Sequence, residues 1–151
     1  MSVPLWSAAV TSTSGGWFTD AGDVAAADHI AKWNGTAWSA LGTGLNGIVK
    51  AIAVSGSDVY VGGWFTDAGD VAVADHIAKW NGTAWSALGT GLNSTVNAIA
   101  VGTLYVGGWF TDAGGVAAAD YIAKWDVAPE IDVQRPAGTF IADGDPDNVG
   151  N

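Results

Sequence analysis

The chain has 151 residues, of which 49% are hydrophobic, 13% are charged and 22 are glycine. These proportions fit one globular domain and exclude a disordered acidic tail and a packed helical bundle. Fifteen acidic against five basic side chains give a formal net charge of -10, which argues against nucleic acid and anionic membrane as partners.

The N-terminal residues carry no targeting signal that we can identify. Residues 1–6 lack the charged and apolar regions of a signal peptide, and no apolar run of bilayer length follows, so we expect no membrane insertion. Trp6-Ser7-Ala8 has the same sequence as Trp38-Ser39-Ala40, which lies on the predicted fourth strand of the first repeat. The segment would therefore serve as a fourth strand in a sheet of a neighbouring chain. Residues 7–10 alternatively align with residues 51–54 and would open the first repeat, which the spacing to Gly15 favours.

Internal repeats organise most of the chain. Residues 15–46 recur at 62–93 with a single change, from Ala26 to Val73. A third copy begins at Gly107 and loses its likeness after Trp125. The repeats lie at approximately 7–46, 47–93 and 94–128, within one unit of residues 1–128 that precedes a tail of residues 129–151.

Each repeat reads as four short strands. In the middle copy they are expected at residues 49–54, 59–65, 76–80 and 84–88. Asn81-Gly82 predicts a tight hairpin between the last two, with positive φ at both positions. The middle strands are almost continuously apolar, which indicates sheets covered on both faces rather than a sandwich with one wet face. The predicted fold is all-β, with about three four-stranded antiparallel blades of a β-propeller.

Three short motifs of the repeat resemble those of known families. The elements VGGxFT, IAKW and WSALGxG, at 61–66, 77–80 and 85–91, are similar to bacterial β-propeller repeats of the delta-60, Rax2 and kelch-like type. That resemblance implies an extracellular or cell-surface location. Residues 129–145 resemble the opening of an Ig-like domain of the Hydin or choice-of-anchor sort, which would be cut short at Asn151.

Three blades do not close a ring, since propellers have four to eight. An open arc would expose the flat apolar faces of its end blades, so we expect self-association. A homodimer gives six blades; a trimer or a filament is the alternative. In the third copy, the missing fourth strand would be replaced by residues 131–135 or by the N-terminal strand of a partner.

Nine tryptophans are the most conspicuous side chains. Their uniform places on predicted strands favour a role in the core between blades, each burying ~150–250 Å². We assign this core or interface role to Trp17, Trp64, Trp109 and Trp125. Paired tryptophans across a hairpin would alternatively stack on sugar rings, and the candidates for that are Trp33, Trp38, Trp80 and Trp85.

No catalytic arrangement can be assembled from this sequence. His29 and His76 are copies of one position that carries Tyr121 in the third repeat, so they do not converge on one site. The Gly-x-Gly strings end strands and lack a following helix, so they are not nucleotide fingerprints. We therefore expect no enzyme and no cofactor.

Calcium is the one ion that the acidic residues suggest. The FTDAGD loops, with Asp20, Asp23, Asp67 and Asp70, could supply oxygen ligands, but the Asp-Ala-Gly sequence favours a turn. Asp143, Asp145 and Asp147 alternate as in the first half of a calcium loop but lack the closing bidentate Glu, which favours a disordered acidic end.

The expected role is a structural or interaction module that self-assembles. Identical blades display identical rims, so a weak contact made by one rim is repeated around the ring and the contacts act together. The alternative is a carbohydrate-binding propeller that uses Trp and Asp residues at the rims of the blades.

Overall fold

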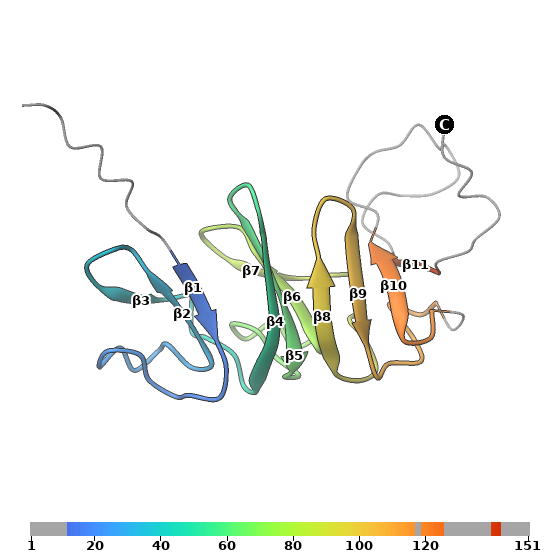
Figure 1. Cartoon of the computed structure of the whole chain (residues 1–151). Coiled ribbons are helices and arrows are strands. Elements are labelled where there is room, and N and C mark those ends of the chain that lie inside the picture. The colour runs from blue at the N-terminus through green and yellow to red at the C-terminus, as the bar shows by residue number, and fades with distance from the viewer. Residues whose placement is uncertain (1–11, 117–118, 126–139, 143–151) are drawn as a thin grey trace, which may run out of the picture.

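The computed structural model describes residues 12–116, 119–125 and 140–142, and in this part of the chain every regular element is a β-strand (Figure 1). The strands form three antiparallel sheets. Sheet 1 holds β1 (Ser12–Gly15), β2 (Ile30–Trp33) and β3 (Trp38–Ala40). Sheet 2 holds β4 (Ile48–Ser55), β5 (Asp58–Trp64), β6 (Ile77–Trp80) and β7 (Trp85–Ala87). Sheet 3 holds β8 (Val96–Ala100), β9 (Leu104–Gly108), β10 (Ile122–Trp125) and β11 (Phe140–Ala142). The all-β class and the antiparallel sheets are confirmed.

The β-branched and apolar runs of the middle repeat form its two long strands, β4 and β5, which pair with each other in antiparallel fashion. Their register shifts between Val49 and Ala51. Gly63 lies opposite this irregularity, where a Cβ atom would overlap the carbonyl oxygen of Ile48. Glycine is therefore required there, and Gly108 meets the carbonyl oxygen of Thr95 in the same way in sheet 3.

The hairpin between β6 and β7 lies where Asn81-Gly82 predicts it, but its geometry differs. Positive φ falls on Gly82 (99°) and not on Asn81. The side-chain oxygen of Asn81 instead accepts the backbone N–H groups of Thr83 and Ala84, at 2.9 Å each. The expectation of positive φ at both positions is wrong because this side chain supplies the turn's hydrogen bonds in place of a second left-handed residue.

The three sheets stack face to face along the chain, as Figure 1 shows. One apolar cluster joins sheets 1 and 2 and includes Leu41, Val61 and Phe65. A second joins sheets 2 and 3 and includes Leu88 and Phe110. Sheet 2 is therefore covered on both faces, which explains why its middle strands are almost continuously apolar.

The two ends of the stack differ from sheet 2. In the described residues sheet 1 has three strands, and β1 matches β5 rather than β4 in the repeat. Residues 4–10, with both of their predicted roles, lie outside the described residues. In sheet 3 the tail supplies the fourth strand, but at Phe140–Ala142 rather than at residues 131–135 or from a partner. Phe140 pairs with Trp125 in the register in which Trp85 pairs with Trp80, so the tail occupies the edge that a partner strand would need.

No helix in the described ranges has the length and apolar character needed to span a bilayer.

Candidate functional surfaces

The contact between neighbouring sheets is built by a six-residue segment that ends each repeat, Leu-Gly-Thr-Gly-Leu-Asn, at residues 41–46 and 88–93. We call it the leucine segment. It leaves the last strand of one sheet and lies against the next. Leu41 and Leu45 are 1% and 4% exposed, and the indole N–H of Trp85 in sheet 2 donates to the carbonyl oxygen of Leu41 at 2.7 Å. The segment thus fills an apolar site and also satisfies a buried indole.

The asparagine that closes the segment bonds the next sheet. The side-chain oxygen of Asn46 accepts the backbone N–H groups of Thr66 and Asp67, at 2.9 and 3.0 Å. Its amide nitrogen donates to the hydroxyl of Thr66 at 3.0 Å. Asn93 makes the same three bonds to Thr111 and Asp112. A single asparagine side chain therefore makes three hydrogen bonds to the loop that follows the second strand of the neighbouring sheet.

A backbone bond completes the contact. Gly69 donates to the carbonyl oxygen of Gly44 at 2.9 Å, and Gly114 donates to that of Gly91 at 2.8 Å. The sheet 1–sheet 2 and sheet 2–sheet 3 contacts are thus built in the same way. Sequence reasoning missed this role of the segment; its signal was that the letters LGTGLN recur identically at the end of two repeats.

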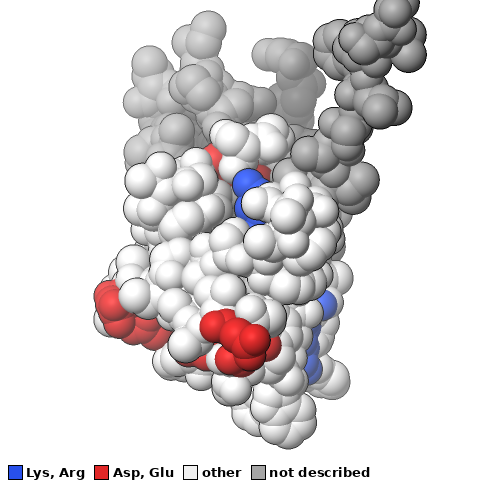
Figure 2. Space-filling model, turned by 90° about the vertical axis from the view of Figure 1, so that its left-hand side faces the viewer, with Lys and Arg blue, Asp and Glu red and all other residues white. Residues whose placement is uncertain are grey.

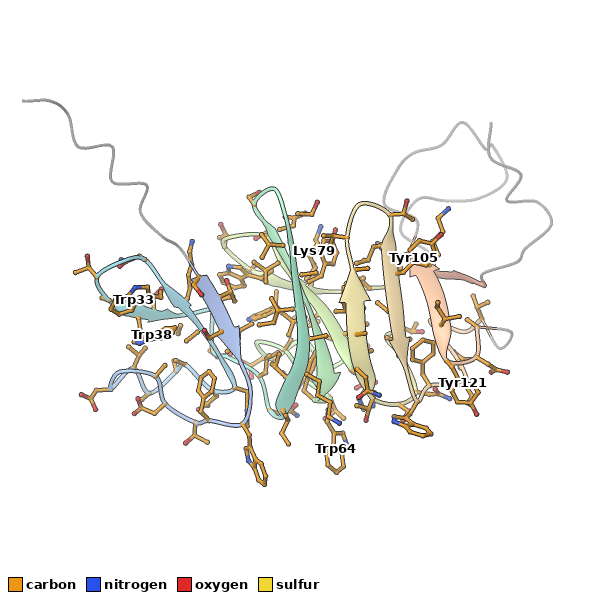
Figure 3. All side chains as sticks on the ribbon, in the orientation of Figure 1. Trp33, Trp38, Trp64, Lys79, Tyr105 and Tyr121 are labelled. Atoms are coloured by element: carbon orange, nitrogen blue, oxygen red, sulfur yellow. The ribbon has the colours of Figure 1, made fainter. Side chains whose placement is uncertain are left out.

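A second surface is a row of exposed tryptophans, Trp17, Trp64 and Trp109, which we call the tryptophan rim. Their exposed fractions are 83%, 62% and 70%, which exclude them from the core that was expected to hold them. In sheet 2, the N–H of His76 donates to the carbonyl of Phe65 at 2.8 Å, and the N–H of Gly63 donates to the carbonyl of His76 at 3.0 Å. Trp64 lies between these two bonded residues and points away from the sheets (Figure 3). A role of the rim in an interface stays a prediction.

The paired tryptophans lie elsewhere. Trp33 and Trp38 face each other across the β2–β3 hairpin, with ring centroids 5.3 Å apart and planes tilted by 55°. Trp80 and Trp85 repeat this geometry at 5.3 Å and 55°, and both pack in the cluster between sheets 1 and 2. Trp125 packs against the cluster between sheets 2 and 3.

The polar groups do not converge on a reactive centre. His29 and His76 have left-handed backbones, with φ of 60° and 62°, and each ring Nδ1 lies 3.3 Å from a carbonyl oxygen of its own sheet. Within the described ranges no group of three or more His, Cys, Asp or Glu residues could hold a metal ion. The side chain of Asp67 accepts the N–H of Asp70 at 2.8 Å, which is a turn bond. Asp143, Asp145 and Asp147 lie outside the described residues, so calcium stays a prediction.

The fold raises the pKa of Tyr60. Burial in the cluster between sheets 2 and 3, and secondarily the charge of Asp58, raises the pKa of Tyr60 above its ordinary value of 10.0. Asp58 itself forms an ion pair with Lys79 at 3.6 Å. The folded state thus disfavours the charged tyrosinate form of Tyr60.

No family model matches the chain, and neither a curated protein nor a solved structure is significantly similar to it.

Proposed function

We propose that the chain is a non-enzymatic structural and interaction module in which each sheet is a blade of a β-propeller-like arc, extended by further sheets. The observation that carries this proposal is the repeated contact between sheets. The same leucines, asparagine and glycine bonds join sheet 1 to sheet 2 and sheet 2 to sheet 3. A contact that is used twice with the same groups is suited to further use in assembly.

Burial favours such an extension. Sheet 2 has a neighbour on each face, whereas the outward face of sheet 1 is not covered by any described residue, and Phe18 and Trp38 there are only partly buried. Figure 2 shows this end of the molecule, with two groups of carboxylates on its lower half and mostly uncharged surface between them and the lysine above. A homodimer of six sheets is the simplest assembly that covers this face; a trimer or a filament would also do so. The extracellular or cell-surface location implied by the resemblance belongs to the same proposal.

Light scattering coupled to size exclusion tests self-association. A particle of twice the chain mass of 15.2 kDa, or larger filaments, supports the proposal. A monodisperse monomer at millimolar concentration, with no tendency to larger species, contradicts self-association. The matched control is Val54→Ala, which removes an exposed apolar side chain (53% exposed) at the end of β4 and should leave the mass unchanged.

The tryptophan rim favours a second candidate function, carbohydrate binding. Three indoles at equivalent places in three repeats would offer three stacking faces to the pyranose rings of a linear polysaccharide. The net charge of -10 favours neutral or cationic glycans over anionic ones. These residues differ from the four sugar-stacking candidates chosen from the sequence.

Affinity electrophoresis in gels with xylan, a neutral glucan or chitosan tests this second function. Retardation of the chain that disappears in the Trp17→Ala, Trp64→Ala, Trp109→Ala triple variant supports it. The control is a Val54→Ala, Val101→Ala variant, which removes exposed apolar side chains outside the rim. Equal mobility of the chain with and without every polysaccharide contradicts it.

A further inference from the structure

The outward face of sheet 1 carries an open cavity of about 330 Å³, lined by Ser14, Phe18, Asp20, Ala21 and Trp38. We call it the sheet 1 cavity. In the repeat, three of its lining residues correspond to Phe65, Ala68 and Trp85. Those three are buried in sheet 2, where the cluster that contains them also contains both leucines of residues 41–46. The sheet 1 cavity thus corresponds to the site on sheet 2 that the leucine segment of residues 41–46 fills.

The cavity already has the shape of the filled site. Trp38 holds the same tilt and separation from its hairpin partner as Trp85 does, 55° and 5.3 Å. Gly22 lies against the indole of Trp38, with a Cβ position 2.8 Å from its Cδ1 atom, and Gly69 lies against Trp85 in the same way. No rearrangement of the indole is needed to receive a ligand, so binding would cost little in side-chain ordering.

The hydrogen-bond donors of the filled site are also repeated. In sheet 2 the indole of Trp85 and the backbone N–H groups of Thr66, Asp67 and Gly69 all donate to residues 41–46. The equivalent donors in sheet 1 are the indole of Trp38 and the N–H groups of Thr19, Asp20 and Gly22, and none of these donates to an acceptor among the described residues. The outward face of sheet 1 therefore offers four hydrogen-bond donors. The equivalent donors of sheet 2 show what such a set binds, because all four bond to residues 41–46.

We propose that the sheet 1 cavity binds a Leu-Gly-x-Gly-Leu-Asn segment of a partner polypeptide built from the same repeat. This inference rests on the proposed stacking function and names its partner. Both leucine segments of the chain are already seated, on sheets 2 and 3.

The test titrates the ¹⁵N-labelled chain with a capped peptide of residues 86–94, SALGTGLNS, which contains no tryptophan. The indole resonance of Trp38, assigned through its loss in Trp38→Phe, should move toward that of Trp85 and saturate at millimolar peptide. The matched control peptide carries Leu88→Asp and Leu92→Asp and should bind at least about tenfold more weakly, because it would bury two charges.

Two protein variants separate the cavity from the fold. Ala21→Leu would fill the cavity and abolish the shift without lowering stability, whereas Ala68→Leu, at a site that is 0% exposed, would disturb the sheet 1–sheet 2 contact. Trp38→Phe should weaken peptide binding about fivefold, since it loses one hydrogen bond.

The outcomes distinguish the two proposals. If the peptide causes no shift at Trp38, or the Asp control peptide binds equally, the assignment of the cavity is overturned, and an assembly seen by light scattering would still support the stacking function. If the peptide binds to a chain that stays monomeric, the cavity assignment stands while self-association fails.

Discussion

Asn46→Ala should loosen the contact between sheets 1 and 2 by about 1.5 kcal/mol. The side chain makes three hydrogen bonds of 2.9–3.0 Å to Thr66 and Asp67, and all three are exposed to solvent. Water replaces such bonds in the variant, so each contributes at the low end of the ordinary range, roughly 0.5 kcal/mol. The sum is similar to the loss of a helix N-cap, in which one side chain also satisfies consecutive backbone N–H groups.

The assay is urea unfolding followed by circular dichroism. Asn34→Ala is the matched control: its side chain also accepts two backbone N–H bonds, at 2.9 and 2.8 Å, but within one hairpin of sheet 1. Asn46→Ala, unlike this control, should increase amide exchange at Thr66 and Asp67. Asn46→Asp keeps the acceptor and loses the donor, and it should fall between Asn46→Ala and the unchanged chain. An Asn46→Ala chain that unfolds within about 0.3 kcal/mol of the unchanged one would refute the role of this asparagine.

Three further predictions concern single positions. Trp85→Phe should cost about 1–2 kcal/mol, because it removes the buried indole bond to the carbonyl of Leu41, which keeps only the N–H of Gly44 at 3.1 Å, and because the smaller ring leaves a gap in the core. Trp38→Phe should cost less than about 0.5 kcal/mol, and equal losses in urea unfolding would contradict this. Gly63→Ala should cost at least about 3 kcal/mol or prevent folding, because its Cβ would overlap a backbone oxygen, whereas Gly56→Ala, with φ of 61° and open space around it, should cost about 1 kcal/mol by the same assay. Because the pKa of Tyr60 is higher in the folded than in the unfolded chain, the folded state disfavours the tyrosinate. The free energy of unfolding should therefore be unaffected by this group below about pH 10 and should fall as the pH rises from the unfolded pKa through the folded pKa. Unfolding midpoints from about pH 9 to pH 11 should therefore fall more steeply in the unchanged chain than in Tyr60→Phe, and parallel curves would speak against this.

The strands were predictable from local sequence because their causes are local. The run at 49–54 lies inside β4, and the run at 59–65 covers all but the first residue of β5, since β-branched residues between turn signals have few alternatives. The tail strand was missed because Phe140–Ala142 is only three residues long, and only the pairing of Phe140 with Trp125 reveals it.

Burial of the tryptophans could not be read from their own repeat. Trp38 and Trp85 stand in identical local sequence, yet only Trp85 has a leucine segment against it, because burial here depends on the preceding sheet. Trp64 is exposed although the residues on either side of it, Gly63 and Phe65, both bond to the left-handed residue His76. A left-handed histidine is rare enough that periodicity gives no warning of it.

The contact between sheets has a direction, and this restricts how the module can assemble. Sheets 1 and 2 each give a leucine segment to the next sheet, and sheet 2 receives one on its opposite face. Two copies that met sheet 1 to sheet 1 would bring together two receiving faces, and the indole of Trp38 would gain no carbonyl partner. Extension by a partner that supplies a leucine segment to sheet 1 must therefore run head to tail, and the rotation at each contact decides between a closed ring and a filament. Because a ring and a filament built through this segment use the same face of sheet 1, Ala21→Leu should block both, whereas it should not affect an assembly formed through the tryptophan rim.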